Sequence, residues 1–177
     1  FLIETFPEQT ELLQVARAIN DQKPLSVIKQ VLDKTTELRN NSNTLPKVFI
    51  MGLAFKPDVD DIRQSPALQI AMALHAKSDA LEVKVYDHNI PLNVLQKYDF
   101  SIASDVWRGI DWADIVLVLV KHKEFVLMHQ DVFCGKVVID SCGLLYDMQT
   151  RQSRSVLEGA TKTDTVFWKT GVMKDLS

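Results

Sequence analysis

Apolar residues recur at helical spacing through residues 8–39, in one stripe before Pro24 and a second stripe after it. The two stripes consist of Leu12, Leu13, Ala16 and Ile19, and of Leu25, Ile28, Val31 and Leu32. Because proline is tolerated in the first turn of a helix, Pro24 can occupy the start of a second helical stretch. One interpretation of Asn20 and Asp21 is then that they end the first stretch. An apolar arm of this length must pack on another domain or another subunit.

After a polar segment at residues 40–46, which indicates a linker, short apolar runs alternate with helical patterns. Strands are predicted at residues 47–51, 82–87, 114–120 and 135–140. Ser65 and Pro66 suit the start of a helix between the first two strands. The alternation predicts an α/β fold, a Rossmann-like parallel sheet with helices on both faces, preceded by the helical arm.

Ligands of such sheets bind at the carboxyl ends of the strands, so function is expected in the loops that begin at Gly52, Asp87, Lys121 and Asp140. The first of these loops concentrates basic and acidic side chains beside a helix N-terminus, a setting that favours phosphate. A lysine and an arginine there would complement a diphosphate. The alternative is a surface loop whose charges merely pair with one another.

The same loop does not have the glycine pattern of a dinucleotide site. Gly52 stands alone, and Asp87 lies farther downstream than the roughly 20 residues typical of a ribose-binding acid. The preferred interpretation of Asp87 is a cap of the next turn, with ribose binding as the alternative. The residues therefore predict a nucleotide-binding fold without an NAD site in this chain.

Composition narrows the classes of partner. The 177 residues carry a formal net charge of -3 with scattered basic side chains, which gives no electrostatic case for nucleic acid or an anionic membrane. No apolar run is long enough to span a bilayer. Cys134 and Cys142 are too few for a disulfide scaffold and share no metal-ligand spacing with a histidine, so we expect no metal and a reduced, cytoplasmic protein.

Three stretches carry a family resemblance. Residues 52–67 resemble the signature G-x-A-F-K-x-x-x-x-D-x-R-x-S-P-A of the UDP-glucose/GDP-mannose dehydrogenase family. Residues 16–24 resemble the central-helix pattern A-R-x-x-N-D-x-K-P of its UDP-N-acetylmannosamine dehydrogenase branch, and residues 113–125 resemble the strand, histidine and phenylalanine of that branch. The resemblance covers roughly residues 1–146.

This resemblance implies an organisation in which residues 1–45 belong to a central helical arm that builds a homodimer. Residues 46–146 would be the UDP-binding domain, and residues 147–177 an unassigned tail, either docked or partly disordered. The NAD-binding domain and the nucleophilic cysteine would lie in polypeptide that precedes Phe1, so this chain alone would be inactive. The implied reaction is NAD-dependent oxidation of a UDP-sugar at C6, as in UDP-N-acetylmannosaminuronate formation for bacterial surface polysaccharides.

The resemblance also assigns residues. Phe55 and Lys56 would line the UDP-sugar site, and Arg63 would either contact the ligand or, as we prefer, fold back onto Asp60 or Asp61. Cys142 stands where relatives carry a basic residue, which implies either an altered choice of substrate or compensation by Lys121 or Lys123. Cys134 is expected to be a small core residue. The competing hypothesis is a stand-alone nucleotide-binding or interaction module without catalysis.

Overall fold

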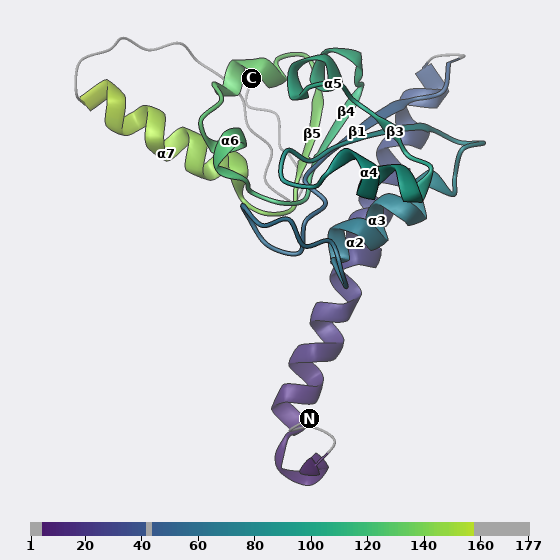
Figure 1. Ribbon diagram of the computed structural model, residues 1–177, viewed down its shortest axis with the longest axis vertical. Coiled ribbons are helices and arrows are strands. Elements are labelled where there is room, and N and C mark those ends of the chain that lie inside the picture. Colours follow the sequence, from purple (N-terminus) through teal and green to yellow (C-terminus); the bar gives the residue numbers. More distant parts are fainter. Residues whose placement is uncertain (1–4, 42–43, 158–177) are drawn as a thin grey trace.

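The structure, a computed structural model, describes residues 5–41 and 44–157 and is built on a five-stranded parallel sheet in the order β3-β2-β1-β4-β5 (Figure 1). The strands are β1 (Lys47–Met51), β2 (Glu82–Tyr86), β3 (Ser101–Ile102), β4 (Ile115–Val118) and β5 (Val137–Asp140). β1 pairs with both β2 and β4, so the chain builds outward from β1 to one edge and then crosses to the other side. The predicted parallel sheet is confirmed, and β3 is an edge strand that the sequence pattern did not predict.

Helices cover both faces of the sheet, as predicted. Successive side chains of a strand point to opposite faces, so one strand contributes to two cores. Val48 and Ile50 of β1 join one core, and Phe49 and Met51 join the other. The first core is covered by α2 (Glu11–Asn41), α3 (Pro66–His75) and α4 (Leu92–Leu95), and the second by α5 (Val106–Trp112), α6 (Lys123–Val126) and α7 (Leu144–Leu157). The 3-10 helices are η1 (Pro7–Gln9), η2 (Gln96–Tyr98) and η3 (Gln130–Phe133).

The helical arm is one continuous helix and not two stretches. α2 runs for 31 residues with Pro24 inside it, so the prediction that Asn20 and Asp21 end a helix before Pro24 is wrong. An internal proline removes one backbone hydrogen bond and costs about 3 kcal/mol, which is why a break was expected there. The helix nevertheless continues, and its C-terminal part is held by the domain, where Val31 and Thr35 are buried.

The two halves of α2 have different surroundings. Val27, Ile28, Leu32 and Leu38 pack against the first core, and α2 lies along α3 there. The N-terminal half projects away from the α/β domain (Figure 1) and leaves Leu12, Ile19 and Leu25 at 81%, 60% and 66% exposure. The apolar stripe predicted in the arm therefore meets the core only in its second half.

The C-terminal helix α7 runs through the boundary placed at residue 146. Leu144, Leu145 and Met148 are buried in the second core, so the beginning of the predicted tail is docked on the domain. The rest of that tail, from residue 158, lies outside the described residues.

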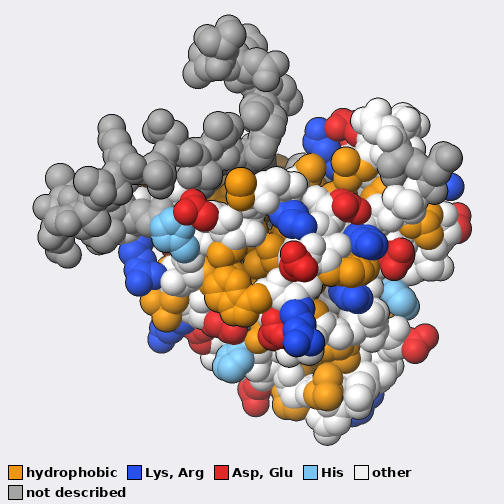
Figure 2. Space-filling view, turned by 90° about the horizontal axis from the view of Figure 1, so that it is seen from above, with side chains coloured by type: hydrophobic (Ala, Val, Ile, Leu, Met, Phe, Trp, Pro, Cys, Tyr) orange, Lys and Arg blue, Asp and Glu red, His pale blue; other side chains and the backbone are white. Residues whose placement is uncertain are grey.

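The side of the molecule away from the arm is seen in Figure 2. Apolar side chains gather near its middle, and basic and acidic side chains are interspersed around them. This mixed charge agrees with the scattered basic residues noted in the sequence. Within the described residues, no helix combines the length and the apolar character needed to cross a membrane.

Candidate functional site

The candidate site lies where the connections that leave β1 and β4 turn to opposite faces of the sheet. β1 leads to α3 on one face and β4 leads to α6 on the other, although the two strands are neighbours. In open parallel sheets such a switch point is the usual place for a ligand. The β1–α3 loop, residues 52–65, and the β4–α6 loop, residues 119–122, meet there.

Gly52 begins the β1–α3 loop in a conformation that suits glycine. Its φ is 86°, in the left-handed region, and a Cβ placed on it would lie 2.6 Å from the Cβ of Val120. The N–H of Gly52 donates to the carbonyl of Tyr86 at 2.9 Å. The loop therefore leaves the sheet in contact with the chain that follows β4.

Asp87, which follows β2, fixes the base of this loop. Its Oδ2 accepts the backbone N–H groups of Leu53 and Ala54 at 2.7 and 2.9 Å, and its Oδ1 accepts the N–H of Asn89 at 2.9 Å. Burial by itself would raise the pKa of Asp87, but the hydrogen bonds from His122, Leu53 and Ala54 outweigh it and the pKa lies below its ordinary value. The capping interpretation of Asp87 is confirmed, and the carboxylate is too enclosed to bind a ribose.

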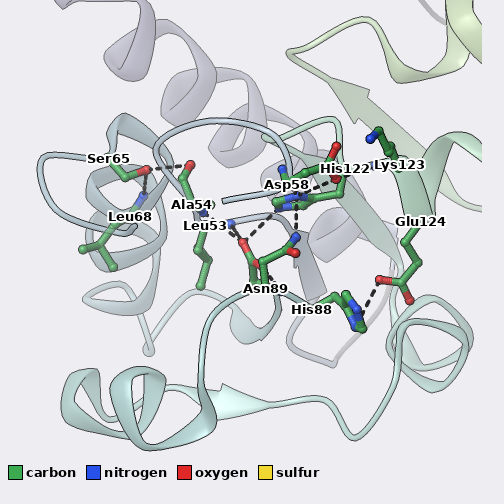
Figure 3. A network of polar contacts seen from close by, with 11 residues as sticks. Leu53, Ala54, Asp58, Ser65, Leu68, His88, Asn89, His122, Lys123 and Glu124 are labelled. Atoms are coloured by element: carbon green, nitrogen blue, oxygen red, sulfur yellow. Dashed lines mark hydrogen bonds and ion pairs between the residues drawn. The ribbon is translucent and has the colours of Figure 1, made fainter. Parts of the chain in front are cut away.

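His122 connects Asp87 to the middle of the loop (Figure 3). Its ring is fully buried, with Nε2 3.1 Å from Asp87 Oδ2 and Nδ1 2.9 Å from the backbone nitrogen of Asp58. In return, Oδ1 of Asp58 accepts the N–H of Lys123 at 2.9 Å. The β1–α3 and β4–α6 loops are thus tied together from both sides.

Arg63 folds back onto its own loop, as preferred from the sequence. Its Nε and Nη2 donate to the two carboxylate oxygens of Asp61 at 3.0 and 2.9 Å, so Asp61 and not Asp60 is the partner. The hydrogen bond from Arg63 lowers the pKa of Asp61 to about 2. The pair is exposed, and its effect is to shape the surface of the loop.

The N-terminus of α3 is capped by the side chain of Ser65. The Oγ of Ser65 accepts the N–H of Leu68 at 3.4 Å and donates to the carbonyl of Ala54 at 3.2 Å (Figure 3). Ser65 and Leu68 are buried, at 1% and 8% exposure. Ser65 therefore caps the helix from within, and the base of the loop covers it. Phosphate binding by this loop stays a prediction, and the exposed cation available for it is Lys56 at the tip.

Phe55 and Lys56 form the exposed tip of the loop, together with Pro57. The N–H of Phe55 donates to the carbonyl of Asp61 at 2.7 Å, while its ring is 47% exposed. The Nζ of Lys56 lies 5.7 Å from the centroid of that ring, and within the described part of the chain Lys56 forms no ion pair. A flat apolar surface and a cation are therefore presented side by side on a backbone that is anchored on both sides.

The loop after β5 is also closed by an aspartate. Asp140 accepts the N–H groups of Cys142, Gly143 and Leu145 at 3.1, 2.8 and 2.9 Å. Burial and the neighbouring Asp140 raise the pKa of Cys142 to about 12, so its thiol stays protonated at neutral pH.

The basic residues offered as compensation for Cys142 differ in their surroundings. Lys121 is held in an ion pair with Asp147 at 2.6 Å. Lys123 has an exposed side chain in the first turn of α6. Cys134 is exposed and not a core residue, because it follows η3 at the surface, directly before the turn at Gly135, so that prediction is wrong.

Sequence reasoning missed the parts of the network that lie far apart in the chain. Asp58, Asn89 and His122 converge although 31 to 64 residues separate them, as the Asn89 Nδ2–His122 Nδ1 distance of 2.8 Å illustrates. The available signal was that each follows a strand whose carboxyl end reaches the switch point. Among the described residues, no group of histidine, cysteine or carboxylate side chains is arranged to hold a metal ion.

Comparison with protein families matches residues 49–147 to the UDP binding domain of the UDP-glucose/GDP-mannose dehydrogenase family. The chain is 36% identical over 134 residues to a UDP-N-acetyl-D-mannosamine dehydrogenase of Campylobacter jejuni, covering 74% of this chain and 31% of the relative. It is 32% identical over 155 residues to one of Escherichia coli (strain K12), covering 81% and 35%. The chain thus spans about a third of the length of these curated relatives.

Solved structures of nucleotide-sugar dehydrogenases are similar to this chain in fold. The UDP-N-acetyl-mannosamine dehydrogenase Cap5O from Staphylococcus aureus superposes with a TM-score of 0.60 at 32% identity, covering 81% of this chain and 32% of that one. A UDP-glucose dehydrogenase from Pyrobaculum islandicum has the same TM-score of 0.60 at 21% identity, covering 78% and 30%. The second of these likenesses concerns the fold alone.

Proposed function

Because the chain belongs to the UDP-glucose/GDP-mannose dehydrogenase family, we propose that it is the UDP-sugar-binding part of a larger NAD-dependent dehydrogenase. The proposed substrate is UDP-N-acetylmannosamine, oxidised at C6 to the uronate. One observation carries the proposal: Phe55 and Lys56 stand exposed on a loop that is anchored to three strand ends. A site built on such a rigid support loses little conformational entropy when it takes up a ligand.

The roles of the loop residues follow from their placement. The ring of Phe55 offers a flat apolar surface for a nucleoside, and Lys56 offers a positive charge for the diphosphate. Arg63 keeps the loop surface in shape through Asp61, and a ligand phosphate would have to compete with that carboxylate to recruit it. These assignments give Phe55 and Lys56 the direct contacts and Arg63 the supporting role.

The contribution of this chain to the reaction is binding and position. Interactions with the nucleotide, remote from the reacting carbon, hold the sugar so that its C6 faces the catalytic groups of the rest of the protein. Cys142 is unsuited to be the nucleophile, because its raised pKa keeps the thiol protonated.

NAD would accept the hydrides in the complete protein, and the described residues do not fit it. The amides of Leu53 and Ala54, which a glycine-rich loop would offer to a pyrophosphate, are bonded to Asp87 instead. We therefore place the NAD site, like the nucleophile, in polypeptide outside this chain.

The exposed half of α2 is the proposed homodimer surface, in a cytoplasmic protein. Leu12, Val15 and Ile19 are large apolar side chains that the domain leaves uncovered, and a second copy would bury them. Sedimentation velocity tests this assignment: we expect a dimer that becomes a monomer when Leu12→Asp and Ile19→Asp are combined. A dimer that survives both changes would place the interface elsewhere.

Calorimetric titration of the chain with UDP, UDP-N-acetylmannosamine and NAD tests the function. Binding of both uridine nucleotides without binding of NAD is expected. Binding of NAD alone would overturn the proposal, and binding of none of them would favour an interaction module. Turnover of a panel of UDP-sugars by the full-length protein then identifies the sugar.

A further inference from the structure

We infer that His122 is a positioning residue of the nucleotide site, acting as a neutral imidazole that carries its proton on Nε2. In this form it holds the β1–α3 loop at two points and so sets where Phe55 and Lys56 stand. The inference rests on the proposed function, since the loop positions a nucleotide only if one binds there. His122 itself touches no ligand, because its ring is fully buried.

The hydrogen bonds determine which nitrogen carries the proton. The backbone N–H of Asp58 points at Nδ1 across 2.9 Å, and a backbone amide can only donate, so Nδ1 must be an acceptor. The amide nitrogen of Asn89, also a donor, lies 2.8 Å from the same atom and competes with the Asp58 amide for its single lone pair. Nε2, 3.1 Å from a carboxylate oxygen of Asp87, is then the donor. The ring is neutral in this arrangement.

The two bonds of the ring act on both sides of the exposed tip. On one side, Asp87 accepts a hydrogen bond from the N–H of Nε2. The same carboxylate accepts the amides of Leu53 and Ala54, directly before Phe55. On the other side, Nδ1 holds the amide of Asp58, two residues after Lys56. One imidazole therefore links both sides of the loop base, directly at Asp58 and through Asp87 at Leu53 and Ala54.

The conformation of Asp58 shows why its anchor matters. Its φ is 59°, in the left-handed region that a residue with a side chain seldom adopts without support. The bond from its amide to His122 and the bond from Lys123 to its Oδ1 provide that support. Without His122 the backbone at Asp58 would be free to return to a more common conformation, and Lys56 would move with it.

A second proton on the ring would oppose this arrangement. The charged and polar groups that face it are Asp87 and Asn89, which follow β2, and Asp58 from the β1–α3 loop. Phe125 of α6 meets the ring edge-on, at 5.3 Å between ring centroids. The two carboxylates would retain a charged ring, but a proton on Nδ1 would displace the amide of Asp58.

Two substitutions separate the two anchors. Asn at position 122 can place an acceptor near the position of Nδ1 and keep the Asp58 bond, while Gln can place a donor near that of Nε2 and keep the Asp87 bond. We expect His122→Asn and His122→Gln each to weaken UDP binding by about three- to tenfold, the range of one net hydrogen bond. His129→Gln, which changes an exposed histidine outside the network, is the matched control and should leave UDP affinity unchanged.

Three measurements on the chain test the inference. Nitrogen NMR of labelled histidine should show Nδ1 of His122 unprotonated and Nε2 protonated. Hydrogen exchange of the Asp58 amide should accelerate in His122→Gln and not in His122→Asn, with the amide of Val116 in the interior strand β4 as the internal reference. Calorimetry of UDP binding by the two variants and by His129→Gln is the third measurement.

The outcomes distinguish this inference from the proposed function. A protonated Nδ1 at neutral pH, or unchanged Asp58 exchange in His122→Gln, would overturn the positioning role. So would wild-type UDP affinity in both variants. If the wild-type chain binds no UDP although the tautomer and the exchange are as stated, the proposed function fails and the anchoring of the loop by His122 stands.

Discussion

In the loops that follow β1 and β5, an aspartate side chain caps the free backbone N–H groups of the turn. The two loops differ in the side chains that they leave exposed. In each, a strand-end aspartate accepts a group of backbone N–H donors: Asp87 for the β1–α3 loop and Asp140 for the β5–α7 loop. The nearby cations differ, because Lys121 is held by Asp147 whereas Lys56 forms no ion pair in the described part of the chain. The same kind of cap thus supports a loop whose nearby lysine is paired in one place and, in the other, the loop that we propose binds the nucleotide.

The largest expected contrast concerns stability. Asp87→Ala should lower the free energy of unfolding by about 3–5 kcal/mol, because it leaves buried donors of Leu53, Ala54 and His122 without an acceptor. Asp140→Ala removes a half-exposed cap and should cost only about 1–2 kcal/mol. Urea unfolding of both variants measures the difference. Equal losses would mean that the two caps are equivalent and that burial does not distinguish them.

The second contrast concerns the two lysines. Lys56→Ala should weaken UDP binding roughly 10- to 100-fold, the loss of one charge-assisted contact to phosphate. Lys121→Ala should change the affinity little, since its charge is already neutralised by Asp147. Calorimetry checks both, with Lys77→Ala, an exposed lysine beyond the far end of α3, as the control. A strong effect of Lys121→Ala would make it the substitute for the basic residue that Cys142 replaces.

A third prediction concerns acid. The folded-state pKa of Asp87 lies below its ordinary value, so the stability it contributes is present above the unfolded pKa of about 3.9 and is lost as the pH falls through the lower, folded value. Thermal unfolding followed from pH 7 downward should show this loss begin as the pH approaches about 4 and continue below it. Asp87→Asn should be less stable at pH 7 and should depend less on pH below about 4. A pH dependence identical to that of the wild type would assign the loss to other carboxylates.

The smallest effect is expected at the exposed pair in the β1–α3 loop. Arg63→Ala should hardly change the melting temperature, since exposed ion pairs contribute little to stability. It should weaken UDP binding only a few-fold and mainly at low salt, because added salt already screens the charges of the pair. Calorimetry at two salt concentrations checks this. A loss as large as that of Lys56→Ala would mean that Arg63 leaves Asp61 to contact the ligand.

Local patterns predicted the elements better than the contacts. The apolar runs at residues 47–51 and 114–120 and the Ser65–Pro66 start were confirmed because strand and cap signals act over a few residues. The break at Pro24 was wrong because a long helix can accept one missing hydrogen bond, and β3 was missed because two residues form no pattern. Cys134 was predicted to lie in the core because cysteine is a small and usually buried residue type, but its turn lies at the surface.

Alternation of apolar and polar residues by itself predicted the α/β architecture. The motif at residues 52–67 identified the β1–α3 loop as the candidate site and Phe55, Lys56 and Arg63 as its candidate residues. Only the tertiary structure decided how that loop is held, since Asp58 and Asp87 reach His122 from other strand ends. The physical reason is the parallel sheet, which gathers the carboxyl ends of strands that lie far apart in the chain. Hydrogen bonds formed there depend on distance in space, which spacing along a sequence does not specify.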